Sequence, residues 1–272
     1  MMTDFGIKDG NVGVMKGVIW GICPEAQIAD ISHMIAAQDI REAALILARS
    51  TPYFPPGTIH LVVVDPGVGT ARRPMAARIG ESFYVGPDNG LITLWLEQSR
   101  HLSQDASFIV LDRPTYWRPD VSRVFHGRDI FAPVAAYLAR GLSLQELGSE
   151  LTDPVLLQLP RPRPIAGGLE GEIIHIDHFG NAASNIMLDD IRPAMGDARK
   201  VQVRLGPTQI AGIVGTFGER SSGEVVALFG STGNLIVSVV NGSAAAELHL
   251  KVGDAIRVEL AGRPDERDGV AA

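Results

Sequence analysis

The sequence predicts an α/β protein with an N-terminal three-layer α/β domain, built on a mostly parallel sheet, and a C-terminal antiparallel β domain. In residues 1–153, strand-length apolar runs alternate with stretches of helical periodicity, as in layered α/β folds. From residue 166 to 272, short Val- and Ile-rich runs follow one another between Gly and Asp turns, which is typical of antiparallel sheets. Four prolines in residues 154–165 remove amide donors and favour extended backbone, so this segment is predicted to be a linker.

The elements of the first domain follow from its periodicity. We expect strands at residues 27–31, 58–64 and 108–111, and helices at 12–21, 40–49, 91–98 and 130–140. The run at 58–64 is almost continuously apolar, which predicts a strand covered on both faces of the sheet. In the second domain we expect strands at 171–177, 201–205, 210–217, 224–229, 235–240 and 255–260.

The composition is that of a globular protein. The 272 residues include 24 Lys and Arg against 31 Asp and Glu, a formal net charge of −7, and 46% are apolar, which excludes a disordered chain. An acidic chain lacks the basic surface that general nucleic-acid binding needs, so no nucleic-acid partner is expected. The lone Cys23 excludes an internal disulfide and the usual cysteine-based zinc sites.

The sequence also predicts a cytoplasmic protein. No signal peptide is visible after Met1, and the longest apolar runs, at 61–64 and 235–240, are far too short to cross a bilayer. We therefore expect no membrane partner and a reducing compartment.

Polar, glycine-rich segments mark the places where chemistry could occur in the first domain. They are 3–6 with Asp9, 65–70 with Arg72, 86–90, and 125–129. Ligands of open α/β sheets bind beyond the carboxyl ends of the strands, where Asp65 is expected. Taken alone, Asp4 and Asp65 are equally compatible with turn chemistry and with a functional role. The glycines at 67–69 lack both nucleotide-binding fingerprints, so a phosphate loop is rejected.

His126 is the histidine with the most suggestive context. It precedes a predicted helix, the adjoining Gly127 allows a ligand to approach closely, and Arg128 and Asp129 add charge. The remaining histidines, His33 included, have no comparable context and are interpreted as bystanders.

One segment of the second domain combines an acid, an aromatic ring and amides. Residues 177–185 contain Asp177, Phe179 and Asn181, and an Asn side chain suits the edge of a purine while Phe can stack on its face. An Asn-rich turn between strands is the alternative. The loop at 230–234 offers further backbone amides.

Five motifs together resemble a known family. In chain order they are Thr3-Asp4-Phe5-Gly6, Val64-Asp65-Pro66-Gly67-Val68-Gly69-Thr70, Asp88-Asn89-Gly90, Phe125-His126-Gly127-Arg128-Asp129 and Phe179-Gly180-Asn181. They are similar to those of the S-adenosyl-L-methionine (SAM) hydroxide adenosyltransferases, which are related to the fluorinases and chlorinases. The resemblance implies hydrolysis of SAM to adenosine and L-methionine without a cofactor or metal. It also implies a homotrimer whose active sites lie between subunits.

The resemblance carries over to individual residues. It implies that Asp65, Arg72 and His126 activate the water, with Arg73 as the neighbouring alternative to Arg72. The residues implied to bind substrate are Asp4 at the ribose; Asp9, Asp177 and Ser231 at the methionine; Phe179, Asn181 and Phe217 at the adenine; and Phe125. The identity of the proton acceptor is left open between Asp65 and His126.

Three other functions stay open at this point. A halide adenosyltransferase is one, although the related halogenases carry an inserted loop after the arginine-bearing segment and lack an acid where Asp65 stands. A metal-dependent phosphohydrolase could gather carboxylates and one imidazole, namely Asp4, Asp9, Asp65, Asp88 and His126. A non-catalytic module that binds adenosine or SAM is the third.

Overall fold

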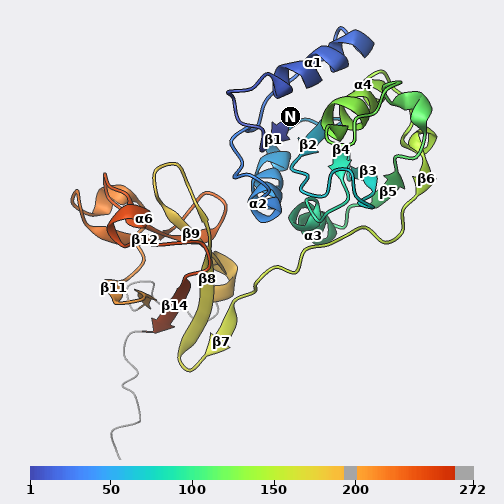
Figure 1. The fold of residues 1–272 in the computed structure, drawn as a ribbon. Coiled ribbons are helices and arrows are strands. Elements are labelled where there is room, and N and C mark those ends of the chain that lie inside the picture. Colours follow the sequence, from blue (N-terminus) through green and yellow to red (C-terminus); the bar gives the residue numbers. More distant parts are fainter. Residues whose placement is uncertain (193–200, 261–272) are drawn as a thin grey trace, which may run out of the picture. The chain divides into compact units, whose positions relative to one another are not determined.

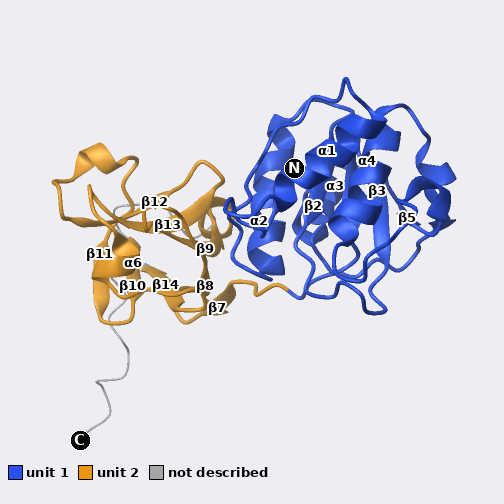
Figure 2. Ribbon diagram, turned by 45° about the horizontal axis from the view of Figure 1, so that its top comes forward, with its two compact units in different colours: residues 1–158 blue, residues 159–272 orange. Residues whose placement is uncertain are grey.

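The computed structural model describes residues 1–192 and 201–260, and the chain divides into two compact units, residues 1–158 and 159–272 (Figures 1 and 2). The predicted linker, 154–165, spans the boundary between these units. Its last residues are not linker, because Arg163–Ile165 forms strand β7, which pairs antiparallel with β8. Among the described residues, no helix is long and apolar enough to cross a membrane.

Unit 1 is a mixed sheet with helices on both faces. Its strands follow the order β1-β2-β4-β3-β5-β6. Their bounds are Met2–Thr3 (β1), Ile59–Val63 (β2), Pro74–Ile79 (β3), Ser82–Pro87 (β4), Ala106–Val110 (β5) and Ser149–Glu150 (β6). The α-helices are Asn11–Ile22 (α1), Ile40–Ser50 (α2), Thr93–His101 (α3) and Ala132–Ala139 (α4); shorter turns are Thr51–Tyr53 (η1), Pro114–Tyr116 (η2), the π-helical Gly127–Phe131 (η3) and Leu144–Leu147 (η4).

The prediction that this sheet is mostly parallel was wrong. The pairs β1–β2 and β2–β4 are parallel, but β3 pairs antiparallel with both β4 and β5, and β5 with β6. The cause is a hairpin in which Ile79 pairs with Ser82, so that Gly80 and Glu81 form a two-residue turn. Gly80 has a φ of +59°, which favours glycine, and such short turns join antiparallel strands.

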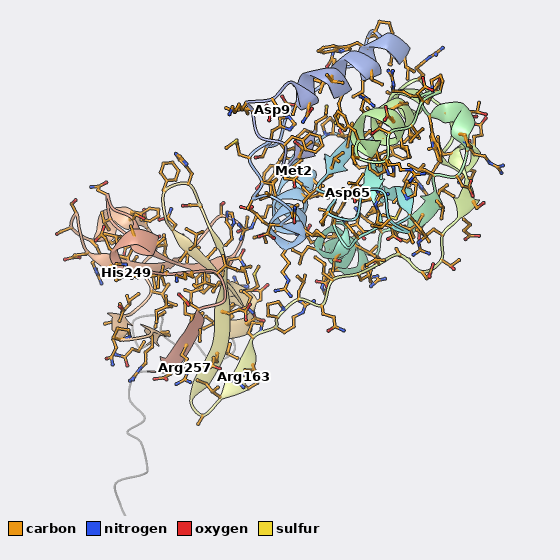
Figure 3. The ribbon with its side chains drawn as sticks, in the orientation of Figure 1. Met2, Asp9, Asp65, Arg163, His249 and Arg257 are labelled. Atoms are coloured by element: carbon orange, nitrogen blue, oxygen red, sulfur yellow. The ribbon has the colours of Figure 1, made fainter. Side chains whose placement is uncertain are left out.

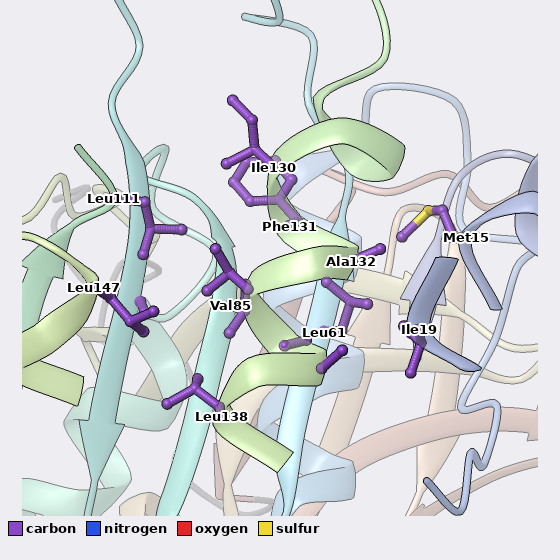
Figure 4. Packing of buried hydrophobic residues seen from close by; sticks show 14 of the residues in the cluster. Met15, Ile19, Leu61, Val85, Leu111, Ile130, Phe131, Ala132, Leu138 and Leu147 are labelled. Atoms are coloured by element: carbon purple, nitrogen blue, oxygen red, sulfur yellow. The ribbon is translucent and has the colours of Figure 1, made fainter. Parts of the chain in front are cut away.

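Strand β2 is buried on both faces, as its apolar run predicts. Leu61 and Val63 point into a core formed with α1 and α4, whereas Val62 and Val64 point into a second core formed with α2 and α3. Figure 4 shows the first core, where Met15 of α1 and Leu138 of α4 pack against the sheet. The two cores fix β2, and with it the position of Asp65.

One local prediction for unit 1 was wrong, and two strands were not predicted. Residues 27–31 form no strand, although a parallel bridge joins Met2 to Ser32 just beyond them. Strands β3 and β4 were missed because their residues are buried without a clear alternation.

Unit 2 is an antiparallel sheet in the order β11-β10-β14-β8-β9-β13-β12. A parallel bridge between Val214 and Leu228 links the chain after β11 to β12, so the sheet is nearly closed. The bounds are Gly168–Ile176 (β8), Ala182–Met187 (β9), Val201–Leu205 (β10), Thr208–Ala211 (β11), Val225–Phe229 (β12), Asn234–Val239 (β13) and Ala255–Leu260 (β14), with helices Leu188–Ile191 (α5) and Ala244–Glu247 (α6) and the turn Phe217–Glu219 (η6).

Alternating burial builds the core of unit 2. In β10, Val201, Val203 and Leu205 are buried, and the residues between them are not. The expected strand at 210–217 was too long: β11 ends at Ala211, and Gly212 follows with a φ of +78°. Phe217 therefore lies on the short turn η6.

Acid should destabilise unit 1 through His60. This residue of β2 is 2% exposed and lies edge-on between Phe54 and Trp95, with ring centroids 5.2 and 5.1 Å away. Burial lowers the pKa of His60 from 6.5 to about 4. Between these two values the unfolded chain binds a proton that the native state does not, so stability falls as the pH falls from 6.5 towards 4.

From this difference we expect a loss of about 2–3 kcal/mol between pH 7 and pH 4.5, measured by urea unfolding. His60→Leu should remove that part of the pH dependence. An identical pH dependence in the wild type and in His60→Leu would contradict the assignment.

Candidate active site

Asp65 lies at the carboxyl edge of the parallel part of the sheet (Figure 3). It follows the fully buried Val64 just after β2, and only 5% of its side chain is exposed. The parallel register pairs Thr3 with Val63, so Asp4 and Asp65 leave their strands at the same edge. The structure thus places these two acids where α/β sheets bind ligands.

A tight turn brings Arg72 back onto Asp65. Arg72 Nε donates to Asp65 Oδ1 at 3.0 Å, and Arg72 Nη2 donates to Asp65 Oδ2, so the pair is bidentate. The intervening loop is compact because Val68 N donates to the Asp65 carbonyl and Gly69 adopts a φ of +75°. A Cβ at Gly69 would lie 2.4 Å from the carbonyl oxygen of Arg123, so only glycine fits there.

The ion pair is almost completely buried. Only 7% of the Arg72 side chain is exposed, and its guanidinium carbon lies 5.4 Å from the centre of the Phe131 ring. A buried pair of this kind needs good geometry to offset its desolvation, and the bidentate contact provides it. The two groups therefore hold one another in a single arrangement.

His126 completes the group. Its Nδ1 lies 3.1 Å from Arg72 Nη2. Because a guanidinium can only donate, Nδ1 accepts this hydrogen bond, and a neutral His126 then carries its proton on Nε2. Burial lowers the pKa of His126 below its ordinary value, and the positive charge of Arg72 lowers it further, so the ring is neutral at pH 7.

Arg73 does not belong to this group. Its Nε donates to Asp88 Oδ2 at 2.9 Å, and its Nη1 donates to Asp153 Oδ1 at 2.7 Å. Of the two neighbouring arginines, it is therefore Arg72 that contacts Asp65.

The segment that carries Asp4 is held by residues that the sequence did not single out. Asp4 Oδ2 accepts a hydrogen bond from the backbone nitrogen of Gln38 at 2.8 Å, and Gln38 adopts a φ of +67°. His33, interpreted as a bystander, lies 2.9 Å from the hydroxyl of Thr3 and 3.0 Å from a carboxylate oxygen of Asp30. Its carbonyl also accepts from Gly6 N at 2.8 Å. His33 thus contacts Thr3 before Asp4 and Gly6 after it, which holds the segment in place.

The other candidates in unit 1 lie near these segments in the chain. Phe125 meets Phe5 edge-to-face, with ring centroids 5.8 Å apart, and the guanidinium of Arg128 lies 5.1 Å from its ring centre. Asp9 is exposed in the turn before α1 (Figure 3).

In unit 2, three candidate residues form one turn. Asp177 Oδ1 accepts from the backbone nitrogens of Phe179 and Asn181, each at 2.9 Å, and Asp177 Oδ2 accepts from Asn181 Nδ2 at 2.8 Å. This turn leaves Phe179 73% exposed. Both interpretations of the segment therefore have support, because Asp177 organises a turn and the turn presents an aromatic ring.

The remaining candidates of unit 2 lie on separate turns. Ser231 is exposed between β12 and β13, and Phe217, on η6, is 40% exposed.

Two of the carboxylates that a metal centre would need are paired with arginines. Asp65 is paired with Arg72, and the buried Asp88 is paired with Arg73. Over residues 1–192 and 201–260, no three His, Cys, Asp or Glu side chains are grouped so that they could hold a metal ion. The arrangement that a metal-dependent phosphohydrolase requires is thus not found in this part of the chain.

Comparison with known proteins decides the family. Residues 1–148 match the N-terminal domain of the SAM hydroxide adenosyltransferases, and residues 171–257 match their C-terminal domain. The chain belongs to the SAM hydroxide adenosyltransferase family.

Named members and relatives of this family support the match. An (R)-S-adenosyl-L-methionine hydrolase of Salinispora tropica is 40% identical over 94% of this chain and 95% of its own. A protein of the same name from Thermus thermophilus is 41% identical over 94% and 97%. A fluorinase of Nocardia brasiliensis is more distant, at 28% identity over 95% of both chains. Among solved structures, an uncharacterized conserved protein from Thermotoga maritima has a TM-score of 0.87 and 35% identity, covering 94% of this chain and 98% of its own.

Proposed function

We propose that this member of the SAM hydroxide adenosyltransferase family hydrolyses SAM to adenosine and L-methionine by in-line attack of water on C5′. The observation that carries the proposal is the buried ion pair of Asp65 and Arg72, with the partly buried His126 beside it, at the carboxyl edge of the sheet. Relatives with 35–41% identity are named (R)-S-adenosyl-L-methionine hydrolases, which supports the (R)-sulfonium form as substrate.

The chemistry explains why such a group suffices. The leaving group of SAM is a neutral thioether, so its departure needs no general acid. Water is a weak nucleophile and must approach C5′ in line with the breaking C–S bond. Holding the reactants in that pose can contribute roughly 7–11 kcal/mol, whereas a positioned base adds about 10²–10⁴-fold in rate. Positioning therefore lowers the barrier more than the base does.

The hydrogen bonds favour Asp65 as the proton acceptor. Arg72 occupies Nδ1 of His126, and Nε2 of the neutral ring carries a proton, so neither nitrogen is free to accept one. Each oxygen of the Asp65 carboxylate can accept a second hydrogen bond beside the one from Arg72. In this proposal Asp65 receives the proton of the water, Arg72 holds the acid and the imidazole, and Nε2–H of His126 orients the water.

Substrate contacts complete the proposal. Asp4, beside Asp65 at the sheet edge, binds the ribose hydroxyls, Asp9 contacts the methionine portion, and Phe125 is a further substrate-binding residue. The second unit contributes Asp177 and Ser231 to the methionine portion, and Phe179, Asn181 and Phe217 to the adenine. The active form is a homotrimer in which a neighbouring subunit completes each site, and SAM is the substrate, with no cofactor required. The compartment is the cytoplasm, where the free Cys23 thiol stays reduced.

The test is incubation of the purified protein with SAM in H₂¹⁸O, with products separated by chromatography and mass spectrometry. We expect adenosine and methionine in equal amounts, ¹⁸O in the adenosine 5′-hydroxyl, and no effect of a chelator. The rate should fall on the acid side with a midpoint below pH 6.5, as His126 becomes protonated.

Three outcomes would count against the proposal. 5′-Chloro-5′-deoxyadenosine, formed in the presence of chloride, would favour a halide adenosyltransferase. Loss of activity in chelator would favour a metal-dependent reaction. Bound but unreacted SAM would favour a binding module.

A further inference from the structure

The motif Asp88-Asn89-Gly90 contributes no residue to the group of Asp65, Arg72 and His126, yet it contacts the strand end that carries Asp65. The side-chain nitrogen of Asn89 donates to the backbone carbonyl of Val64 at 2.9 Å. Val64 is fully buried and immediately precedes Asp65. This hydrogen bond joins residues 25 positions apart, so it connects the β4–α3 loop directly to the end of β2.

The loop that carries Asn89 is itself fixed. Asp88, 3% exposed, accepts from Arg73 Nε at 2.9 Å and from the backbone nitrogen of Val155 at 2.8 Å. Gly90 has a φ of +98°, and a Cβ there would lie 2.6 Å from Cγ of Leu157. The backbone on both sides of Asn89 is therefore held in place.

The same loop also reaches the other half of the ion pair. Arg73, held by Asp88, directly follows Arg72 in the chain. One loop thus restrains the backbone beside Asp65 through Asn89 and the backbone beside Arg72 through Asp88. The bidentate contact between Asp65 and Arg72 depends on both backbones being in place.

The orientation of the Asn89 amide follows from its partner. A carbonyl can only accept, so the amide nitrogen must face Val64. The amide oxygen is buried and, within the described parts of the chain, has no hydrogen-bond partner. An aspartate at this position would keep the shape of the side chain but could not donate to the Val64 carbonyl.

We propose that Asn89 is a positioning residue for the reaction: by holding the Val64 carbonyl, it fixes the Asp65 carboxylate against Arg72 and His126. This inference rests on the proposed hydrolysis of SAM. It assigns no substrate contact to Asn89. Its effect should therefore be seen in turnover and not in substrate binding.

The test is Asn89→Asp, compared with Asn185→Asp as a matched control. Asn185 Nδ2 likewise donates to a backbone carbonyl, that of Pro160 at 3.1 Å, and its oxygen accepts from Glu172 N. Asn185→Asp thus also loses a side-chain amide that donates to a backbone carbonyl, but at a place that does not contact Asp65, Arg72 or His126. We expect Asn89→Asp to lower kcat roughly 10- to 100-fold, with KM changed less than about 3-fold, and Asn185→Asp to leave kcat unchanged.

Hydrogen–deuterium exchange supplies a readout that does not require activity. The backbone amides of Asp65, Gly67 and Val68 should exchange faster in Asn89→Asp than in the wild type, because the Val68 amide donates to the Asp65 carbonyl. Wild-type kcat and wild-type exchange in Asn89→Asp would overturn the inference, as would an equal loss of kcat in both variants. Failure of the wild type to release adenosine would refute the proposed function instead, and exchange would still decide whether Asn89 fixes the strand end.

Discussion

Asp65→Asn is expected to abolish most turnover while leaving substrate binding nearly intact. Asparagine keeps the shape of the side chain but removes the negative charge that accepts the proton of the attacking water. We expect kcat to fall about 10²–10⁴-fold, the range that a positioned base contributes. Because the water, and not the nucleoside, lies against this carboxylate in the proposal, KM for SAM should change less than about 3-fold. An equal fall of kcat and kcat/KM is the pattern of an interaction made only in the transition state.

Asp112→Asn is a matched control for this experiment. Asp112 lies in the same unit and accepts hydrogen bonds from the backbone and hydroxyl of Ser149, outside the group of Asp65, Arg72 and His126. It should retain wild-type turnover. Calorimetric titration with adenosine should give the same affinity for the wild type and Asp65→Asn. If Asp65→Asn turns over SAM at the wild-type rate, the assignment of the proton acceptor is wrong.

Local signals in the sequence pointed to the segments of Asp65 and His126, but their grouping with Arg72 was implied only by the family resemblance. Asp65 ends an apolar run, Gly67 and Gly69 follow it, and His126 stands at the start of a predicted helix next to Gly127. These features point to the carboxyl edge of a sheet without any knowledge of the fold. The choice of Arg72 over Arg73 needed the structure, because both lie in the same turn and only the backbone path decides which one meets Asp65.

The residues that sequence reasoning missed act through distant contacts. His33 meets Thr3 across 30 positions, Gln38 meets Asp4 across 34, and Asn89 meets Val64 across 25. No periodicity or spacing in the sequence reports such pairs, since they form only when folding brings distant segments together. The Asp88-Asn89-Gly90 motif was visible in the sequence, but the hydrogen bond from Asn89 to the strand end before Asp65 was not.

The errors in the predicted fold also arise where the sequence carries no clear local signal. The N-terminal sheet was expected to be mostly parallel because helices and strands alternate, but the β3–β4 hairpin interrupts that alternation. Its turn, Gly80-Glu81, carries only one glycine and no Asn or Asp to mark it.

Strand β9 was missed because residues 182–187 include Ser184 and Asn185, which suggested a loop. The structure satisfies both by hydrogen bonds to backbone groups.

The buried ion pair makes a second strong prediction, for stability. Arg72→Met should destabilise unit 1 by about 3–5 kcal/mol at pH 7, because it leaves the Asp65 carboxylate, 5% exposed, without its cation. Removing both charges in Asp65→Asn/Arg72→Met should be less damaging than Arg72→Met alone, since no buried charge is then left unpaired. Urea unfolding of the wild type, both single variants and the double variant completes a thermodynamic cycle that measures the coupling.

A pair whose arginine is exposed provides the comparison for this cycle. Arg163 in unit 2 (Figure 3) contacts Glu170, but 73% of its side chain is exposed, and Glu170 keeps Arg257 as a second partner. Arg163→Met should therefore cost less than about 1 kcal/mol, the usual range for surface ion pairs. If Arg72→Met costs no more than Arg163→Met, water reaches Asp65 freely in the native state. A buried guanidinium would then not be what holds the acid in one position for attack on C5′.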